Sequence, residues 1–157
     1  AAGVVNWVDE KRFLTNLGPL MQENGLFIVY DFWITDRMKG NDAYTGWWHE
    51  RYLKEFPRPP RKEKAWTREM ALPYGFVLKT RRDYRLEYDF DREAFIRFMM
   101  IQSNVNVQIE EGGKSTGEAR EWFLDSLKDI FMKEKETVIF ECYYWNFRKC
   151  GKDEKIF

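Results

Sequence analysis

The longest apolar stretch of the chain is residues 25–33, Gly-Leu-Phe-Ile-Val-Tyr-Asp-Phe-Trp. A run that is apolar at consecutive positions is typical of a strand buried on both faces, as in the centre of a parallel sheet. A helical pattern precedes it, with Asp9 as a potential N-cap and apolar residues at three- and four-residue steps: Phe13, Leu14, Leu17, Leu20 and Met21. Residues 1–5 have the composition of a strand end. This order predicts part of an α/β unit with a central strand at 25–33.

Further elements follow in the second half of the chain. Tyr84, Leu86 and Tyr88 alternate with charged residues and predict a strand within residues 76–88. Asp91 is placed to cap one long helix over residues 91–109. Ser115 and Glu118 have the spacing of a capping box, which predicts another helix. Residues 137–147 are rich in β-branched and aromatic residues and predict the last strand.

Residues 36–64 interrupt this pattern. Residues 36–42 are polar and turn-rich, residues 43–56 predict an aromatic helix, and three prolines (Pro57, Pro59 and Pro60) exclude regular structure after it. We interpret residues 36–64 as a lid-like insertion over the strand ends. Since the chain contains neither an internal repeat nor a linker, we predict a single domain over residues 1–157.

Composition narrows the class of partner. Lys and Arg number 26 and Asp and Glu number 26, so the zero net charge gives no electrostatic basis for binding nucleic acid or an anionic membrane. Two cysteines and one histidine are too few for a disulfide framework or a zinc site, and they suit a reducing compartment. We recognise no signal peptide and no apolar run of transmembrane length, so we expect a cytoplasmic protein.

Two side chains could take part in proton transfer. Asp31 lies near the end of the apolar run, where open α/β sheets bind ligands, so it either faces a crevice or pairs with an arginine. His49 is the only imidazole and could act as a general base from the predicted lid. The alternative for His49 is a solvated or hydrogen-bonded side chain without a catalytic role. Aromatic residues make up 18% of the chain, which favours either a large core or an aromatic pocket.

Two stretches resemble a known family. Residues 6–14 (Asn-Trp-Val-Asp-Glu-Lys-Arg-Phe-Leu) and 24–30 (Asn-Gly-Leu-Phe-Ile-Val-Tyr) are similar to the C-terminal half of class I S-adenosylmethionine-dependent methyltransferases of the type 11 or trans-aconitate-methyltransferase-like kind. In that family a His-Trp-Phe/Val-Asp stretch ends the fourth strand, and a Pro-Gly-Gly turn leads into the fifth. Here Asn6 replaces the histidine, and residues 23–25 (Glu-Asn-Gly) replace the turn. Residues 97–105 and 137–147 match the family's later helix and its antiparallel seventh strand.

The resemblance implies a partial Rossmann-like α/β sheet with an antiparallel last strand and a helical lid. It also implies methyl transfer from S-adenosylmethionine to a small-molecule acceptor. If that transfer needs a base, Asp31 or His49 is the candidate, and we predict no metal. The residues that correspond to the substrate side of the pocket are Asn6, Trp7, Tyr30, Trp33, Trp47, Trp48 and Tyr52.

The family's glycine-rich cofactor loop and its ribose-binding acidic residue have no counterpart in residues 1–157. Both belong to a part of the fold that would precede Ala1. We therefore expect the N-terminal cofactor-binding half to be absent, and the chain to be inactive alone and unable to bind S-adenosylmethionine in the family's manner.

A second class of function stays open, a non-catalytic α/β module that dimerises or binds a ligand. An exposed edge of a truncated sheet is a template for pairing with another chain. On this reading the protein forms a homodimer, or swaps a strand, through the uncovered edge of its sheet. The acceptor substrate cannot be deduced from the residues.

Overall fold

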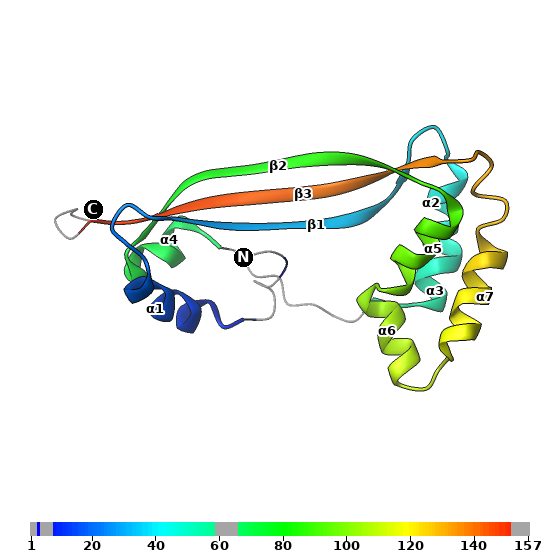
Figure 1. Ribbon diagram of the computed structural model, residues 1–157, viewed down its shortest axis with the longest axis horizontal. Coiled ribbons are helices and arrows are strands. Elements are labelled where there is room, and N and C mark those ends of the chain that lie inside the picture. The colour runs from blue at the N-terminus through cyan, green and yellow to red at the C-terminus, as the bar shows by residue number, and fades with distance from the viewer. Residues whose placement is uncertain (1–2, 4–7, 59–65, 152–157) are drawn as a thin grey trace. The chain divides into compact units, whose positions relative to one another are not determined.

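The computed structural model describes residues 3, 8–58 and 66–151 (Figure 1). The chain is a mixed α/β protein, as predicted. Its elements in chain order are α1 (Glu10–Leu20), β1 (Leu26–Met38), α2 (Ala43–Trp47), the π-helical turn η2 (Trp48–Tyr52), α3 (Leu53–Glu55), α4 (Arg68–Ala71), the 3-10 turn η3 (Leu72–Tyr74), β2 (Phe76–Phe90), α5 (Arg92–Met100), α6 (Ser103–Glu110), α7 (Thr116–Ser126) and β3 (Glu136–Lys149).

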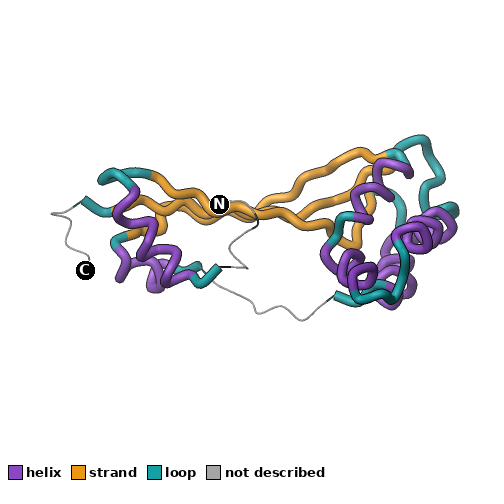
Figure 2. Tube along the Cα trace, turned by 60° about the horizontal axis from the view of Figure 1, so that its bottom comes forward, coloured by secondary structure: helices purple, strands orange, loops and turns teal. Residues whose placement is uncertain are grey.

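The three strands form one sheet in the order β1-β3-β2, so the last strand lies between the two earlier ones (Figures 1 and 2). The backbone N–H of Lys149 donates to the carbonyl of Gly25 at 2.9 Å, and that of Lys39 donates to Thr137 at 2.8 Å. Residue numbers therefore rise along β1 while they fall along β3, which makes the pair antiparallel. The predicted antiparallel last strand is confirmed.

The strand predicted at residues 25–33 is present as β1, and its place at the centre of a parallel sheet stays a prediction. β1 continues to Met38, and its strand neighbour in the described sheet is the antiparallel β3. The apolar run arises because Phe27 and Val29 are buried while Leu26 and Ile28, on the other face, are apolar but exposed. Apolar residues on both faces of a strand thus do not require burial of both faces.

The predicted strand end at residues 1–5 is described only at Gly3. Its backbone N–H donates to the carbonyl of Tyr30 at 3.0 Å, so one residue of this segment is hydrogen-bonded to β1. The other predicted residues of that strand, and the site candidates Asn6 and Trp7, lie outside the described residues.

The chain divides into two compact units. Unit 1 comprises Ala1–Trp33, Arg61–Arg85 and Glu141–Phe157, and unit 2 comprises Ile34–Pro60 and Leu86–Phe140. The core of unit 1 contains Leu14, Phe27, Val29, Trp66, Ala71, Phe76, Trp145 and Phe147. Helix α1 contributes Leu14 to this core. Asp9 is its N-cap as predicted, because the Asp9 carboxylate accepts from the Arg12 N–H at 2.8 Å.

The aromatic segment of unit 2 is packed in the interior of that unit. The side chains of Tyr44, Trp47, Trp48, Tyr52 and Phe56 are each at most 2% exposed. They stack on one another and on α5 and α7: the ring centroids of Trp47 and Tyr52 lie 5.4 Å apart, and those of Phe56 and Phe123 lie 5.2 Å apart. A role of residues 36–64 as a lid stays a prediction.

The predicted single helix over residues 91–109 was wrong, because α5 ends at Met100 and α6 begins at Ser103. Gln102 has ψ 140°, an extended backbone that interrupts the helical hydrogen bonds. Both predicted N-caps are confirmed: Asp91 accepts from the Ala94 N–H, and Ser115 and Glu118 form a reciprocal capping box. Among the helices of the described residues, none combines the length and the apolar composition needed to cross a membrane.

Candidate functional site

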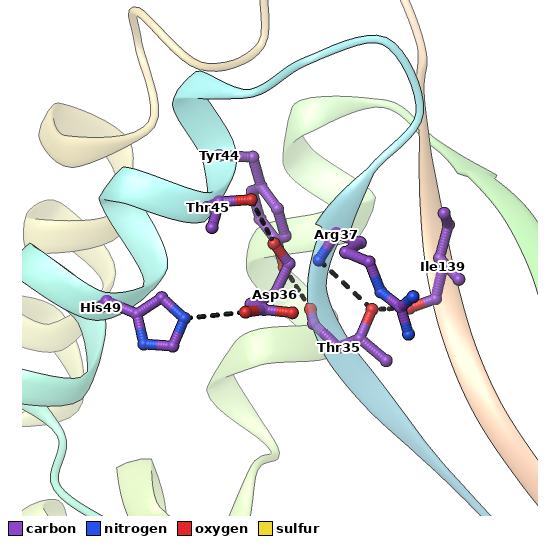
Figure 3. Close-up of polar contacts among 7 residues, drawn as sticks. All are labelled: Thr35, Asp36, Arg37, Tyr44, Thr45, His49 and Ile139. Carbon is purple, nitrogen blue, oxygen red and sulfur yellow. Dashed lines mark hydrogen bonds and ion pairs between the residues drawn. The ribbon is translucent and has the colours of Figure 1, made fainter.

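The histidine of unit 2 forms a pair with an acidic residue near the end of β1. Nε2 of His49 lies 2.7 Å from Oδ2 of Asp36 (Figure 3). Asp36 is two residues before the end of β1, and His49 lies in the π-helical turn η2. Both side chains are partly exposed, 36% for Asp36 and 51% for His49, so a ligand in solvent can reach them. Local π-helical turns occur frequently at functional sites.

Hydrogen bonds on either side of Asp36 connect β1 to its neighbours. The hydroxyl of Thr45, in α2, donates to the backbone carbonyl of Asp36 at 2.8 Å, and the hydroxyl of Tyr44 donates to the carbonyl of Thr35 at 3.3 Å (Figure 3). The Thr35 hydroxyl in turn donates to the carbonyl of Ile139 in β3 at 2.6 Å. The strand that carries Asp36 and the helix that leads to His49 are therefore held together by hydrogen bonds.

This geometry determines where the imidazole can accept a proton. An ionised carboxylate only accepts hydrogen bonds, so Nε2 of His49 carries the proton that it shares with Asp36. In the neutral ring Nδ1 then has the lone pair, and among the described residues it has no hydrogen-bond partner. A basic nitrogen oriented by a carboxylate is the arrangement that general-base catalysis requires.

The phenol next to this pair is not a base at neutral pH. Burial raises the pKa of Tyr44 well above 10, and the nearby Tyr52 and Asp36 raise it further. Tyr44 therefore stays protonated and serves as the hydrogen-bond donor to Thr35.

The site residues predicted in unit 1 lie in the middle of β1. Successive side chains of a strand point to opposite faces, so Asp31 and Trp33 share one face and Tyr30 lies on the other. The Trp33 ring lies 6.1 Å from that of Tyr143. Burial raises the pKa of Tyr143, and the negative charge of Asp31 raises it further. The structure thus brings Asp31 and Trp33 together with Tyr143, a residue of β3 that sequence reasoning missed, and separates Tyr30 from them.

The predicted aromatic residues of unit 2 use their polar atoms inside the core. The indole N–H of Trp47 donates to the Ser126 hydroxyl at 3.1 Å, and the Tyr52 hydroxyl donates to Oδ1 of Asn104 at 3.0 Å. Trp48 is 2% exposed, with the Arg58 guanidinium 5.3 Å from its ring centroid. Contact of these residues with a substrate stays a prediction.

Asp36 is the residue of the pair that sequence reasoning did not identify. The expectation that ligands bind at the carboxyl ends of strands was applied to Asp31, because the strand was predicted to end at Trp33. Ile34 and Thr35 are β-branched and extend the strand, so its true end carries Asp36. The described residues contain no group of three or more His, Cys, Asp or Glu side chains that could hold a metal ion.

Comparison with known proteins gives a likeness of fold. No family model matches the chain, and no curated protein matches it. Among solved structures, a proposed type II methyltransferase from Anaeromyxobacter dehalogenans matches with a TM-score of 0.58 and 16% identity, covering 96% of this chain and 62% of that one. A proposed sarcosine dimethylglycine methyltransferase from Galdieria sulphuraria matches with a TM-score of 0.36 and 11% identity, covering 95% and 51%. A proposed methyltransferase from Bacillus halodurans matches with a TM-score of 0.34 and 14% identity, covering 88% and 62%.

The chain therefore spans between about half and three fifths of the length of these structures. The first match shows that nearly the whole chain has the fold of part of that structure.

Proposed function

We propose that this chain is the substrate-side, C-terminal part of an S-adenosylmethionine-dependent methyltransferase that acts on a small molecule. The single observation that carries the proposal is the strand order β1-β3-β2, in which the last strand is inserted antiparallel between two earlier ones. The family resemblance implies an antiparallel last strand, and β3 pairs antiparallel with β1. The match of 96% of the chain to a methyltransferase structure supports the same assignment.

In this proposal His49 is the base that removes a proton from the acceptor. Nδ1 takes the proton, and the Asp36 carboxylate orients the ring and stabilises the imidazolium that forms. S-adenosylmethionine, when bound, supplies the methyl group as an electrophile, so positioning and deprotonation of the acceptor are what the protein contributes. Asp31, beside Tyr143, is the second candidate for the base.

The test uses the natural full-length protein that contains these residues. Transfer of labelled methyl from S-adenosylmethionine to a panel of small amines, hydroxyl compounds and carboxylic acids is measured for the parent, His49→Gln, Asp36→Asn and Asp31→Asn. His49→Gln is expected to lower kcat at least about 100-fold. Asp36→Asn is expected to lower it less, since Asp36 acts through the imidazole.

Lys128→Gln is the control, because it removes an exposed ion pair with Asp125 elsewhere in unit 2. Its kcat is expected to stay within about twofold of the parent. Full activity of His49→Gln would refute the role of His49. The absence of both S-adenosylmethionine binding and methyl transfer from the parent would refute the proposed function.

A further inference from the structure

The outer edge of β2 is a long uncovered strand. In the sheet order β1-β3-β2, β2 pairs with β3 on one side, and no described strand lies on its other side. β2 has 15 residues, and residues 81 to 89 are all exposed. Such an edge presents unpaired backbone N–H and C=O groups that can bind another strand. The opposite edge of the sheet differs, since Gly3 of the same chain is hydrogen-bonded to β1.

We propose that two copies of this chain pair through β2, edge to edge and antiparallel, with Tyr84 of one copy opposite Tyr84 of the other. A two-fold axis at Tyr84 sets each residue opposite the one equally far on the other side of position 84. Asp83 then faces Arg85 of the second copy, Arg81 faces Glu87, and Lys79 faces Asp89. Every charged residue at the odd positions from 79 to 89 thereby meets an opposite charge.

The charges select this register over its neighbours. A two-fold antiparallel pair places residues of equal parity opposite each other, so the axis can lie only at a residue. Centring at Asp83 sets Arg81 against Arg85, and centring at Arg85 sets Asp83 against Glu87. Like charges directly opposite one another destabilise a strand pair, whereas opposite charges stabilise it.

Registers two residues away are disfavoured in the same way, because each sets one pair of like charges opposite each other. Centring at Arg82 sets Lys79 against Arg85, and centring at Leu86 sets Asp83 against Asp89. Charged edge strands often serve only to prevent pairing with other chains. Here the sequence of positive and negative charges is self-complementary about Tyr84. A strand whose charges only prevent pairing does not need this complementarity.

The side chains concerned leave room for these contacts. Glu87 accepts from Lys39 at 2.7 Å, and Asp89 accepts from the Thr137 hydroxyl at 2.6 Å, in both cases through one carboxylate oxygen. The Arg81 guanidinium lies 5.3 Å from the ring centroid of Trp145. Asp83 and Arg85, which flank the axis, have no ion-pair partner within the described part of the chain.

Apolar side chains lie along the same strand at even positions. Tyr84, Leu86 and Tyr88 are 42%, 48% and 60% exposed. The proposed register places the two Tyr84 rings side by side, and aromatic cross-strand pairs of this kind add to the stability of a strand pair. The ion pairs would fix the register while the aromatic rings supply apolar contact.

The first test is the oligomeric state of chain 1–157, measured by sedimentation equilibrium. We expect a dimer that weakens as salt is raised. Asp83→Arg sets two arginines opposite each other on both sides of the axis, so it is expected to raise the dimer dissociation constant at least about tenfold. Arg85→Asp is expected to have the same effect, because it sets two aspartates opposite each other. The double variant Asp83→Arg/Arg85→Asp restores the opposite charges and is expected to restore the dimer.

Asp129→Arg is the matched control, a charge reversal at an exposed position after α7 that should leave the dimer unchanged. The second test fixes the register. Tyr84→Cys is expected to form an intermolecular disulfide on mild oxidation, because residues on the axis have Cα atoms about 4.5–5.5 Å apart. Leu86→Cys should not crosslink, since it would lie about 13 Å from its own copy.

A monomer at every concentration tested overturns the proposal. So does a dimer that is insensitive to Asp83→Arg, or one that crosslinks through Cys at position 86 and not at 84. The native cysteines, Cys142 and Cys150, are buried and do not supply the crosslink. None of these outcomes depends on methyl transfer, so the interface and the proposed function are tested separately.

Discussion

Buried polar side chains in unit 2 have specific partners. The Tyr52 hydroxyl donates to Oδ1 of Asn104, whose amide nitrogen donates to the carbonyl of Phe56 at 2.7 Å. Tyr52 is 1% exposed and Asn104 is 5% exposed, so water cannot easily replace either bond. This short network connects the aromatic helical segment to α6. Removing one of its polar groups should lower the free energy of unfolding by a measurable amount.

We expect Tyr52→Phe to lower the free energy of unfolding by about 1–3 kcal/mol, because Oδ1 of Asn104 loses its buried donor. Urea denaturation of the two proteins measures the difference. Tyr88→Phe is the control, since the Tyr88 side chain is 60% exposed and its loss of a hydroxyl should change stability by less than about 0.5 kcal/mol. An equal effect of both variants would contradict this account of Tyr52.

The same substitution should have a distinct dependence on pH. Burial raises the pKa of Tyr52 to about 12, whereas the unfolded chain has the ordinary value near 10. Below pH 10 the phenol is protonated in both states, and its contribution is fully present. Between pH 10 and 12 the unfolded state loses the proton first, so this contribution falls by about 1.4 kcal/mol per pH unit. The stability gap between the parent and Tyr52→Phe is therefore expected to narrow as pH rises through this window.

The beginning of α7 depends on a local hydrogen-bonded motif. The Ser115 hydroxyl accepts from the Glu118 N–H at 3.2 Å, and the Glu118 carboxylate accepts from the Ser115 N–H at 2.8 Å. The bond from the Ser115 N–H also lowers the pKa of the Glu118 carboxyl, and the bond from the Ser115 hydroxyl lowers it to a smaller extent. The ionised carboxylate therefore favours the folded state above the ordinary glutamate pKa, and this preference is lost as pH falls through the lowered value.

Ser115→Ala is expected to destabilise the protein by about 1 kcal/mol through loss of this cap. Thermal unfolding followed by circular dichroism measures it. Thr116→Ala, one residue further at an exposed position that does not cap the helix, should have a much smaller effect. If Thr116→Ala proved the more damaging change, the cap would not be what defines the start of α7.

The two faces of β1 should respond differently to substitution. Val29→Ala opens a space in the core of unit 1 and is expected to cost about 2 kcal/mol. Leu26→Thr, on the opposite face, changes a side chain that is 63% exposed and should stay within about 0.5 kcal/mol of the parent in chain 1–157. Denaturant unfolding of both variants decides this, and a large loss for Leu26→Thr would mean that this face is covered in solution.

On the scale of the whole molecule, chain 1–157 matches 62% of the methyltransferase structure that has the TM-score of 0.58. Its sequence lacks a glycine-rich loop between a strand and a helix, the element through which such folds approach their cofactor. The proposed β2 interface requires only residues that the chain contains, so it can be tested on residues 1–157.

We expect titration calorimetry to detect no binding of S-adenosylmethionine to chain 1–157 in the micromolar range, and to detect binding to a full-length protein that contains the chain and a glycine-rich cofactor loop. The physical reason is that cofactor recognition needs backbone close to the cofactor's carboxylate and ribose. Micromolar binding by chain 1–157 alone would show that the cofactor site lies within these residues.

The sequence by itself determined the local structure. The caps at Asp9, Asp91 and Ser115 were predicted because a cap involves residues three positions apart in the chain. The α/β class and the antiparallel last strand were predicted from the order of the elements and from the family resemblance. The single helix over residues 91–109 was mispredicted, since nothing in the spacing of Phe95, Met99 and Val105 marks the extended backbone at Gln102.

Only the tertiary structure decided which residues share a site. The pairing of Asp36 with His49 depends on how α2 folds back on the end of β1, and the proximity of Asp31 to Tyr143 depends on the register between β1 and β3. Likewise, the place of β2 at the edge of the sheet follows from the insertion of β3 between the two earlier strands. Hydrophobic patterns record whether a side chain is apolar, but partners distant in sequence are set by packing, which no local pattern contains.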